Sequence, residues 1–176
     1  MTSSIHYQKN KITDTSTREY SEYYLKKYLV WWRFWTPVEV PFKYFARRIC
    51  KGKTLDVGCG PGRYLSFLHD VTGIDHNPHF IRYARERGFN VYSSENFDKY
   101  FNQHLQEYDT LLFSHILEHM EFPQACRFVG KYLPALKPGG RVVIVVPHGI
   151  SYHNDPSHRC YLDCDLIKKL ALTNSL

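Results

Sequence analysis

The sequence contains no apolar run near the length of about 20 residues that a helix needs to cross a bilayer. Its first eleven residues are polar, so we expect no secretory signal there. The five cysteines are an odd number and scattered along the chain, which does not resemble a disulfide framework. These absences predict a protein of the reducing cytoplasm, and 176 residues suit a single domain.

Internal repeats and low-complexity tracts are also missing, and an apolar content of 43% is ordinary for a folded domain. Positive charge is unevenly placed. Residues 1–53 contain eleven Lys and Arg against four acids, whereas the rest of the chain is close to neutral. Such a segment can attract an anionic substrate, a nucleic acid or a membrane surface, although charge runs are as often solvated helix faces.

The N-terminal segment is rich in aromatic residues. Residues 17–35 predict a helix that ends before Pro37, and a second short helix should end near Ile49. The first helix would cover a substrate pocket or simply pack onto the domain, and its tryptophans leave a membrane-surface contact open. We expect residues 1–52 to form a helical cap on a domain of residues 53–176. The aromatic residues of the first helix are Tyr20, Tyr23, Tyr24, Tyr28, Trp31, Trp32, Phe34 and Trp35.

From residue 54 onward, strand and helix patterns alternate, which is typical of parallel βαβ units. The predicted class is therefore α/β, with a doubly wound, Rossmann-like parallel sheet. The fifth strand is an unbroken apolar run, as in buried parallel strands. Strands are expected at residues 54–57, 71–75, 89–92, 109–113 and 141–146, and helices at 62–69, 78–87, 122–136 and 163–172.

A glycine-rich turn follows the first of these strands. Glycines at this place let a cofactor approach the backbone closely. Asp56, just before the turn, is well placed to meet a positive group, and Asp75, at the end of the next strand, can accept ribose hydroxyls. A nicotinamide-dinucleotide fingerprint would need Gly or Ala where Arg63 stands, so that cofactor is disfavoured.

Four segments together resemble one family. Residues 56–62 (Asp-Val-Gly-Cys-Gly-Pro-Gly) resemble motif I of class I S-adenosylmethionine-dependent methyltransferases. Residues 73–78, 109–120 and 136–147 are similar to the family's later motifs and stand in the correct order, so the resemblance covers roughly residues 53–147. It implies strand order 3-2-1-4-5, S-adenosylmethionine as cofactor, and methyl transfer as the activity.

The resemblance also implies roles for individual residues. Asp56, Gly58 and Gly60 would hold the methionine part of the cofactor, and Asp75 the ribose. Glu95 and Asn96 would flank the adenine, and Ser114 and His115 would line the methyl end. The full expected cofactor set is Asp56, Gly58, Cys59, Gly60, Asp75, His76, Glu95, Asn96, Ser114 and His115.

A histidine-rich loop comes after strand five, and it resembles a loop of small-molecule and sugar methyltransferases. A histidine titrates near neutral pH and suits general-base catalysis, so His148, His153 and His158 are the catalytic candidates. Alternatively, the loop is only held together by hydrogen bonds. The spacing of its His, Asp and Cys residues matches no closed zinc pattern, and no metal is expected. Glu118 and His119 are interpreted as packing and hydrogen-bonding residues.

The residues directly after strand four narrow the substrate class. Enzymes that methylate base amino groups carry Asn or Asp followed by Pro-Pro there, and metal-dependent catechol-type enzymes carry acids. This chain has Ser-His-Ile-Leu at residues 114–117. The prediction is a small-molecule substrate, with hydroxyl acceptors favoured. Two alternatives stay open, a non-catalytic S-adenosylmethionine-binding partner or sensor and an RNA methyltransferase, although a nucleic-acid partner is disfavoured.

The chain departs from the family pattern after strand five. The family's sheet normally ends with two further strands, but only 29 residues come after Pro147. We therefore expect the final antiparallel strands to be missing and strand five to lie at an edge. An apolar edge is a pairing liability, so we expect it to be covered by the C-terminal segment or by a second copy in a homodimer.

Overall fold

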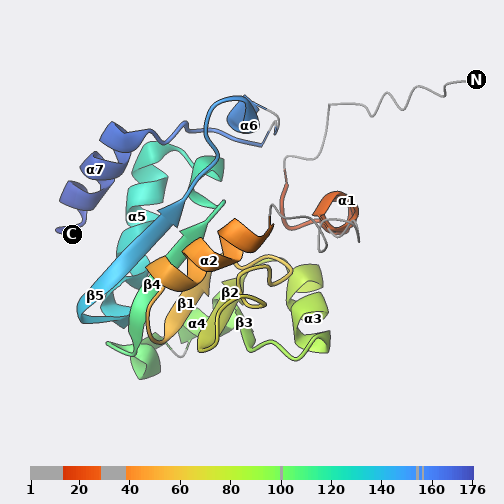
Figure 1. Ribbon diagram of the computed structural model, residues 1–176, viewed down its shortest axis with the longest axis horizontal. Helices are drawn as coiled ribbons and strands as arrows, with labels where there is room; N and C mark the ends of the chain where they lie inside the picture. Colours follow the sequence, from red (N-terminus) through yellow and green to blue (C-terminus); the bar gives the residue numbers. More distant parts are fainter. Residues whose placement is uncertain (1–13, 29–38, 100, 154, 156) are drawn as a thin grey trace, which may run out of the picture.

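The computed structural model describes residues 14–28, 39–99, 101–153, 155 and 157–176. Its centre is one parallel sheet in the order β3-β2-β1-β4-β5, which confirms the predicted topology (Figure 1). No strand comes after β5 within the described residues, so β5 is an edge strand, as expected. The strands are β1 Thr54–Val57, β2 Val71–Asp75, β3 Val91–Ser93, β4 Tyr108–Ser114 and β5 Leu136–Val145.

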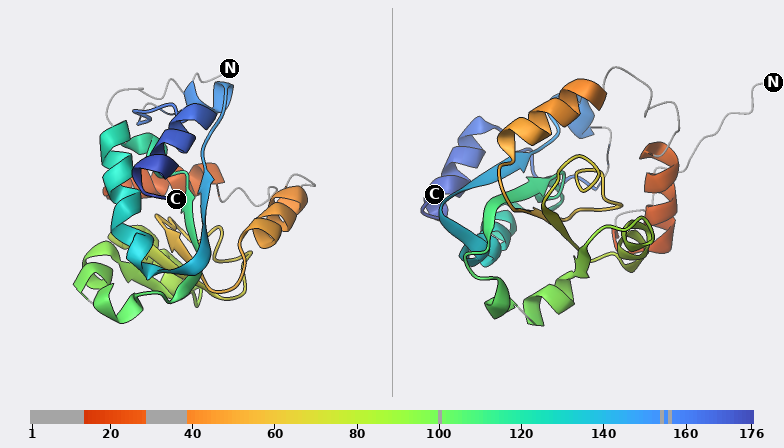
Figure 2. Two further views of the ribbon diagram at one scale, coloured as in Figure 1. Left: turned by 90° about the vertical axis from the view of Figure 1, so that its left-hand side faces the viewer. Right: turned by 60° about the horizontal axis from the view of Figure 1, so that its bottom comes forward.

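Helices pack on both faces of this sheet (Figure 2), and a separate cluster of buried side chains lies between the sheet and the helices on each face. In β4 the side chains alternate: Leu111 and Phe113 belong to the core under α5 and α7, and Leu112 to the core under α2. This alternation follows from the two-residue period of a strand. The helices are α1 Arg18–Tyr28, α2 Glu39–Ile49, α3 Pro78–Glu86, α4 Ser94–Lys99, α5 Phe122–Tyr132, α6 Ile150–His153 and α7 Cys164–Thr173.

The edge strand β5 is covered on both faces. Val142 and Ile144 pack into the cluster that contains Leu170 of α7, and Val143 and Val145 pack against the cluster of α2. Within the described residues, no backbone hydrogen bond joins residues 146–176 to residues 136–144 of β5. The C-terminal segment therefore covers a face of the strand and does not pair with its edge. Pairing with a second copy stays a prediction.

One predicted helix is wrong. Residues 61–67 form consecutive turns, in which Ser66 N donates to Gly62 O (3.1 Å) and Phe67 N to Tyr64 O (2.9 Å), instead of the helix expected at 62–69. The backbone φ of Gly62 is +91°, which is incompatible with a right-handed helix. The glycine loop therefore continues one step further than the pattern predicted.

Other element boundaries differ because of local backbone chemistry. The helix expected at 122–136 ends at Tyr132 and continues as a 3-10 turn, Leu133–Ala135, because Pro134 has no N–H to donate. Strand β5 begins at Leu136 rather than 141, with a register shift against β4. Strand β3 is shorter than expected, and α4 and α6 were not predicted. The helix predicted at 17–35 is described as α1; its part after residue 28 lies outside the described residues.

Candidate functional site

A cavity of about 670 Å³ opens at the carboxyl ends of β1, β2 and β4, where ligands bind in open α/β sheets. Its two ends are different. One end is formed by the glycine loop and two aspartates, and the other by Glu118, His119 and His158. Tyr20 and Tyr24 of α1 also line it, so a helix from the N-terminal segment forms part of the wall.

The glycine loop is fixed to the sheet by its own backbone. Gly58 N and Cys59 N both donate to Ile74 O, at 2.7 and 2.9 Å. At Gly58 φ is +81°, and an added Cβ would lie 2.3 Å from Ile116 Cδ1, so only glycine fits. A Cβ at Gly60 would meet nothing within 4 Å, because this residue faces the open cavity. The loop thus presents bare backbone to a ligand.

Asp56 is a buried carboxylate without a partner. It is 1% exposed, and no described residue donates a hydrogen bond to either oxygen. Burial, with a smaller contribution from the charge of Asp75, raises the pKa of Asp56 to about 8. A positive group entering the cavity would stabilise the ionised carboxylate. The residue therefore fits the ammonium of a cofactor's methionine part.

Asp75 is held in place by backbone donors. Gly60 N donates to its Oδ2 at 2.8 Å, and Asn77 N donates to its Oδ1 at 2.7 Å. Burial raises the pKa of this carboxyl, and the backbone hydrogen bonds oppose that rise. Each carboxylate oxygen accepts two hydrogen bonds, so the carboxylate keeps acceptor capacity toward the cavity for ribose hydroxyls. His76 also lines the cavity, with its Nδ1 3.6 Å from Asp75 Oδ1.

The N-terminal helix is attached to this side of the cavity through Asn77. The Asn77 amide donates to Thr15 O (2.7 Å) and to Ser21 Oγ (2.8 Å), and its oxygen accepts from His79 N at the start of α3. The rings of Tyr20 and Tyr24 pack against Phe80, with centroids 6.2 and 5.4 Å away. The described part of the aromatic helix therefore both packs on the domain and lines the cavity.

The second half of that predicted helix carries Trp31, Trp32, Phe34 and Trp35, which lie outside the described residues, as does the membrane-surface contact expected from them. Among the described helices, none has the length and apolar character that a membrane span requires.

The two residues expected to flank the adenine lie outside the cavity wall. Glu95 and Asn96 are exposed and do not line the cavity, whereas the preceding residue, Ser94, does. Helix α4 begins at Ser94 and places Phe97 in the core. The side chains of Glu95 and Asn96 therefore face outward. The other expected cofactor residues, Asp56, Gly58, Cys59, Gly60, Asp75, His76, Ser114 and His115, all line the cavity.

Of the three histidines proposed for catalysis, only His158 lines the cavity. His148 and His153 are exposed; His148 packs beside Tyr161 (5.8 Å between centroids) and His153 beside Tyr152 (5.4 Å). The loop after β5 turns back toward the sheet, so that Asp155 and His158 of its returning part line the cavity, together with Pro147 at its start.

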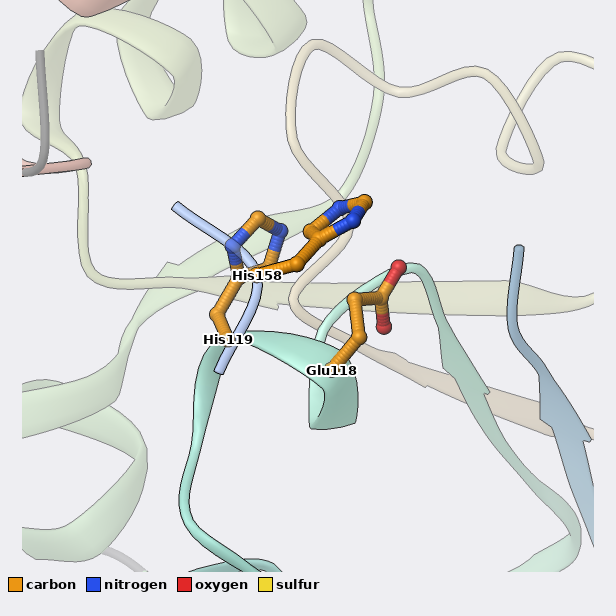
Figure 3. Close-up of side chains that lie close together, drawn as sticks. All are labelled: Glu118, His119 and His158. Atoms are coloured by element: carbon orange, nitrogen blue, oxygen red, sulfur yellow. The ribbon is translucent and has the colours of Figure 1, made fainter. Parts of the chain in front are cut away.

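Glu118 and His119 of the 3-10 turn Leu117–His119, which the sequence analysis assigned to packing and hydrogen bonding, both line the cavity (Figure 3). Glu118 is 1% exposed, and no described residue makes a hydrogen bond to its carboxylate; His115 Nδ1 lies 3.3 Å from Oε1 without hydrogen-bond geometry. Burial lowers the pKa of His119, and the charge of Glu118 opposes that shift. The available signal was a Glu-His pair directly after β4, at the ligand-binding edge of the sheet.

The returning loop is fastened to this turn through its main chain. Arg159 N and Cys160 N both donate to Glu118 O, at 2.7 and 3.2 Å. His119 Nδ1 lies 3.0 Å from Ser157 Oγ, which donates to Asp155 Oδ1 at 2.5 Å. These bonds hold His119 and His158 next to each other, with ring centroids 5.0 Å apart.

Comparison with known proteins gives one family. A model of the methyltransferase domain matches residues 55–144, about half of the chain. An uncharacterised protein of Methanocaldococcus jannaschii is 30% identical over 98 residues, which are 56% of this chain and 46% of that protein. Ubiquinone biosynthesis O-methyltransferase of Klebsiella pneumoniae is 34% identical over 99 residues, 51% of this chain and 40% of that enzyme. The chain therefore spans less than half the length of these relatives.

Solved structures agree on the fold. An S-adenosylmethionine-dependent methyltransferase from Archaeoglobus fulgidus superposes with a TM-score of 0.61 at 21% identity, over 89% of this chain and 67% of that one. The YcgJ protein from Bacillus subtilis gives a TM-score of 0.54 at 18% identity, over 76% of this chain and 65% of that one. With the glycine loop, the unpartnered Asp56 and the matched domain in agreement, the chain belongs to the class I S-adenosylmethionine-dependent methyltransferases.

Proposed function

We propose that this protein transfers a methyl group from S-adenosylmethionine to a small molecule, and that a hydroxyl group is the favoured acceptor. The observation that supports this proposal best is the cavity itself. One continuous space has two differently built ends. The glycine loop with Asp56 and Asp75 forms one end, here called the cradle, and Glu118, His119 and His158 form the other.

The cradle supplies binding and orientation. Asp56 would face the ammonium of the methionine part, and Asp75 would accept the ribose hydroxyls. When bound, S-adenosylmethionine supplies a methyl group on a positively charged sulfur. Because the sulfur leaves as a neutral thioether, much of the rate can come from positioning the acceptor in line. The fixed glycine loop and the strand ends suit that task.

The opposite wall would handle the acceptor. As the new C–O bond forms and the C–S bond breaks, the electron pair of that bond stays on sulfur, and the hydroxyl proton must leave. Polar groups that line the cavity here, including His158, can orient the hydroxyl and pass its proton to water. We retain His158 from the predicted catalytic set, and we do not propose a catalytic role for His148 or His153.

We also propose that residues 1–52 act as a cap on the domain of residues 53–176. The packing of Tyr20 and Tyr24 on Phe80, and their place in the cavity wall, support this role. A reducing, cytoplasmic location is supported by the cysteines, since all five are free.

The test combines binding and turnover. Calorimetry with S-adenosylhomocysteine should show one site per chain, and a labelled-methyl assay should favour hydroxyl-bearing small molecules over amines. Binding without turnover on any acceptor would instead support the sensor alternative. Methylation of RNA with steep salt dependence would support the nucleic-acid alternative. Binding of NADH but not of S-adenosylhomocysteine would contradict the proposal.

A further inference from the structure

Glu118, His119 and His158 form a compact group of metal-ligating side chains. One ligand atom from each lies within 4.8 Å of the other two. Two of the residues come from the turn after β4, and the third comes from the loop after β5 (Figure 3). All three line the cofactor cavity.

The hydrogen bond of His158 leaves one ring nitrogen available. His158 Nδ1 lies 2.7 Å from Tyr152 O, and a carbonyl oxygen only accepts, so Nδ1 carries the proton. In the neutral ring, Nε2 then has a free lone pair. Metal-binding histidines usually show this pattern, with the second nitrogen donating to a carbonyl or carboxylate.

His119 is fixed in the same tautomer by a longer chain of bonds. Ser157 Oγ donates its proton to Asp155 Oδ1, so at its 3.0 Å contact with His119 Nδ1 it must accept. Nδ1 of His119 therefore carries the proton, and Nε2 keeps its lone pair. The two rings lie with their centroids 5.0 Å apart, and one nitrogen of each lies within 4.8 Å of the other ligand atoms of the group.

Glu118 adds a buried negative charge to these lone pairs. Its side chain is 1% exposed, and neither oxygen has a hydrogen-bond partner among the described residues. An unpaired buried carboxylate is costly. The nearest cation candidate, His115, has a side chain 42% exposed and approaches one oxygen only, at 3.3 Å. Among the described residues, no Lys or Arg forms an ion pair with this carboxylate.

We propose that Glu118, His119 and His158 bind a divalent transition-metal ion, with Zn²⁺ as the preferred type, and leave its remaining coordination positions open toward the cavity. Two imidazoles and one carboxylate are a ligand set of catalytic zinc sites, which keep an open position. Imidazole nitrogen also favours Zn²⁺ over Mg²⁺ or Ca²⁺. No metal was expected from the sequence, because residues 118–119 and 158 meet only in the folded chain.

The role of the ion rests on the proposed function. A bound ion would act as a Lewis acid on the acceptor hydroxyl and lower its pKa, so that its proton can pass to water before the C–O bond forms. The imidazoles would then be ligands, and no histidine would have to act as the base.

The experiment uses the full chain and the metal alone, without cofactor or acceptor. After chelator treatment and desalting, Zn²⁺ is titrated by calorimetry, and Co²⁺ binding is followed by its visible absorption. One ion per chain is expected. Glu118→Gln and His158→Gln should weaken Zn²⁺ binding more than Ser157→Ala, which removes only the support of His119 and should cost about tenfold. His69→Gln, an exposed histidine at the opposite end of the sheet, is the matched control.

The inference is overturned if Zn²⁺ does not bind, if Mg²⁺ binds more tightly, or if His69→Gln weakens binding as much as His158→Gln. Calorimetry with S-adenosylhomocysteine on each chelator-treated variant shows whether the variant has folded. The same measurement separates the two proposals. Metal binding without methyl transfer leaves the site intact and contradicts only the proposed function, and S-adenosylhomocysteine binding without metal binding does the reverse.

Discussion

The cradle end and the histidine end of the cavity are built from different parts of the chain. The cradle is formed by the ends of β1 and β2 and the loop between them, so its residues lie close to one another in the sequence. The histidine end joins the turn after β4 to a loop that returns some forty residues later. Both ends contain a buried carboxylate that accepts no hydrogen bond from the described part of the chain, Asp56 in one and Glu118 in the other. They differ in what each carboxylate would meet, an organic cation or a metal ion.

The largest expected effect is at the ribose side of the cradle. We expect Asp75→Asn to weaken S-adenosylhomocysteine binding by about 10- to 100-fold, because hydrogen bonds to a charged group are worth about 1.5–3 kcal/mol. Calorimetry measures this, with Asp70→Asn as the control, since Asp70 is exposed at the other end of β2. Equal affinities in the two variants would show that the cradle does not hold the cofactor.

Asp56→Asn should weaken cofactor binding and stabilise the free protein. The raised pKa of Asp56 means that folding favours the protonated acid. The ionised carboxylate therefore destabilises the folded protein, an effect that is absent below pH 4 and grows as the pH rises toward 8. Replacing Asp56 should therefore raise the melting temperature at pH 7.5 more than at pH 5.

For the wild-type protein, the affinity for S-adenosylhomocysteine should increase from pH 6 to pH 8, because the cofactor's cation needs the ionised carboxylate of Asp56. Scanning calorimetry and titrations at each pH test this, and a pH-independent affinity would contradict it.

Glu118→Gln should separate the two ends. Removing an unpaired buried charge is expected to raise the melting temperature of the metal-free protein by about 2–4 °C per kcal/mol gained. The substitution should also abolish stabilisation by Zn²⁺. The affinity for S-adenosylhomocysteine should change by less than about twofold, because changes at separate sites usually act independently. Thermal shift with and without each ligand gives the comparison. Lower stability in the variant would show that another group compensates the carboxylate.

The smallest effect is expected for Glu95→Ala. Because Glu95 is exposed and outside the cavity, S-adenosylhomocysteine affinity should stay within about twofold of wild type, as for ordinary surface changes. Ser94→Leu, which places a large side chain in the cavity wall, should weaken binding instead. A larger loss of S-adenosylhomocysteine affinity for Glu95→Ala than for Ser94→Leu would instead support the adenine contact expected from the sequence.

The same division separates the features that could be predicted from the sequence from those that could not. The strand order and the residues of the cradle are local in sequence, so motif spacing was sufficient to find them. The extent of the glycine loop depended on a positive φ at Gly62, which no periodicity reveals. The histidine end depended on a returning loop. Glu118 and His158 are forty residues apart, and they are brought together by the hydrogen bonds of Arg159 and Cys160 to Glu118 O and by the contact of Ser157 with His119.

Asn77 has a consequence for the time that a ligand spends in the cavity. Its amide joins α1 to the start of α3, and Tyr20 and Tyr24 close the wall beside it. Each net hydrogen bond contributes about 1 kcal/mol, so with two bonds and the ring packing on Phe80 the detached state of α1 is a minor population. We expect spent cofactor to leave more slowly while that helix is attached, because the opening of a covering element often limits product release. Asn77→Ala should accordingly shorten the residence time of S-adenosylhomocysteine in stopped-flow exchange.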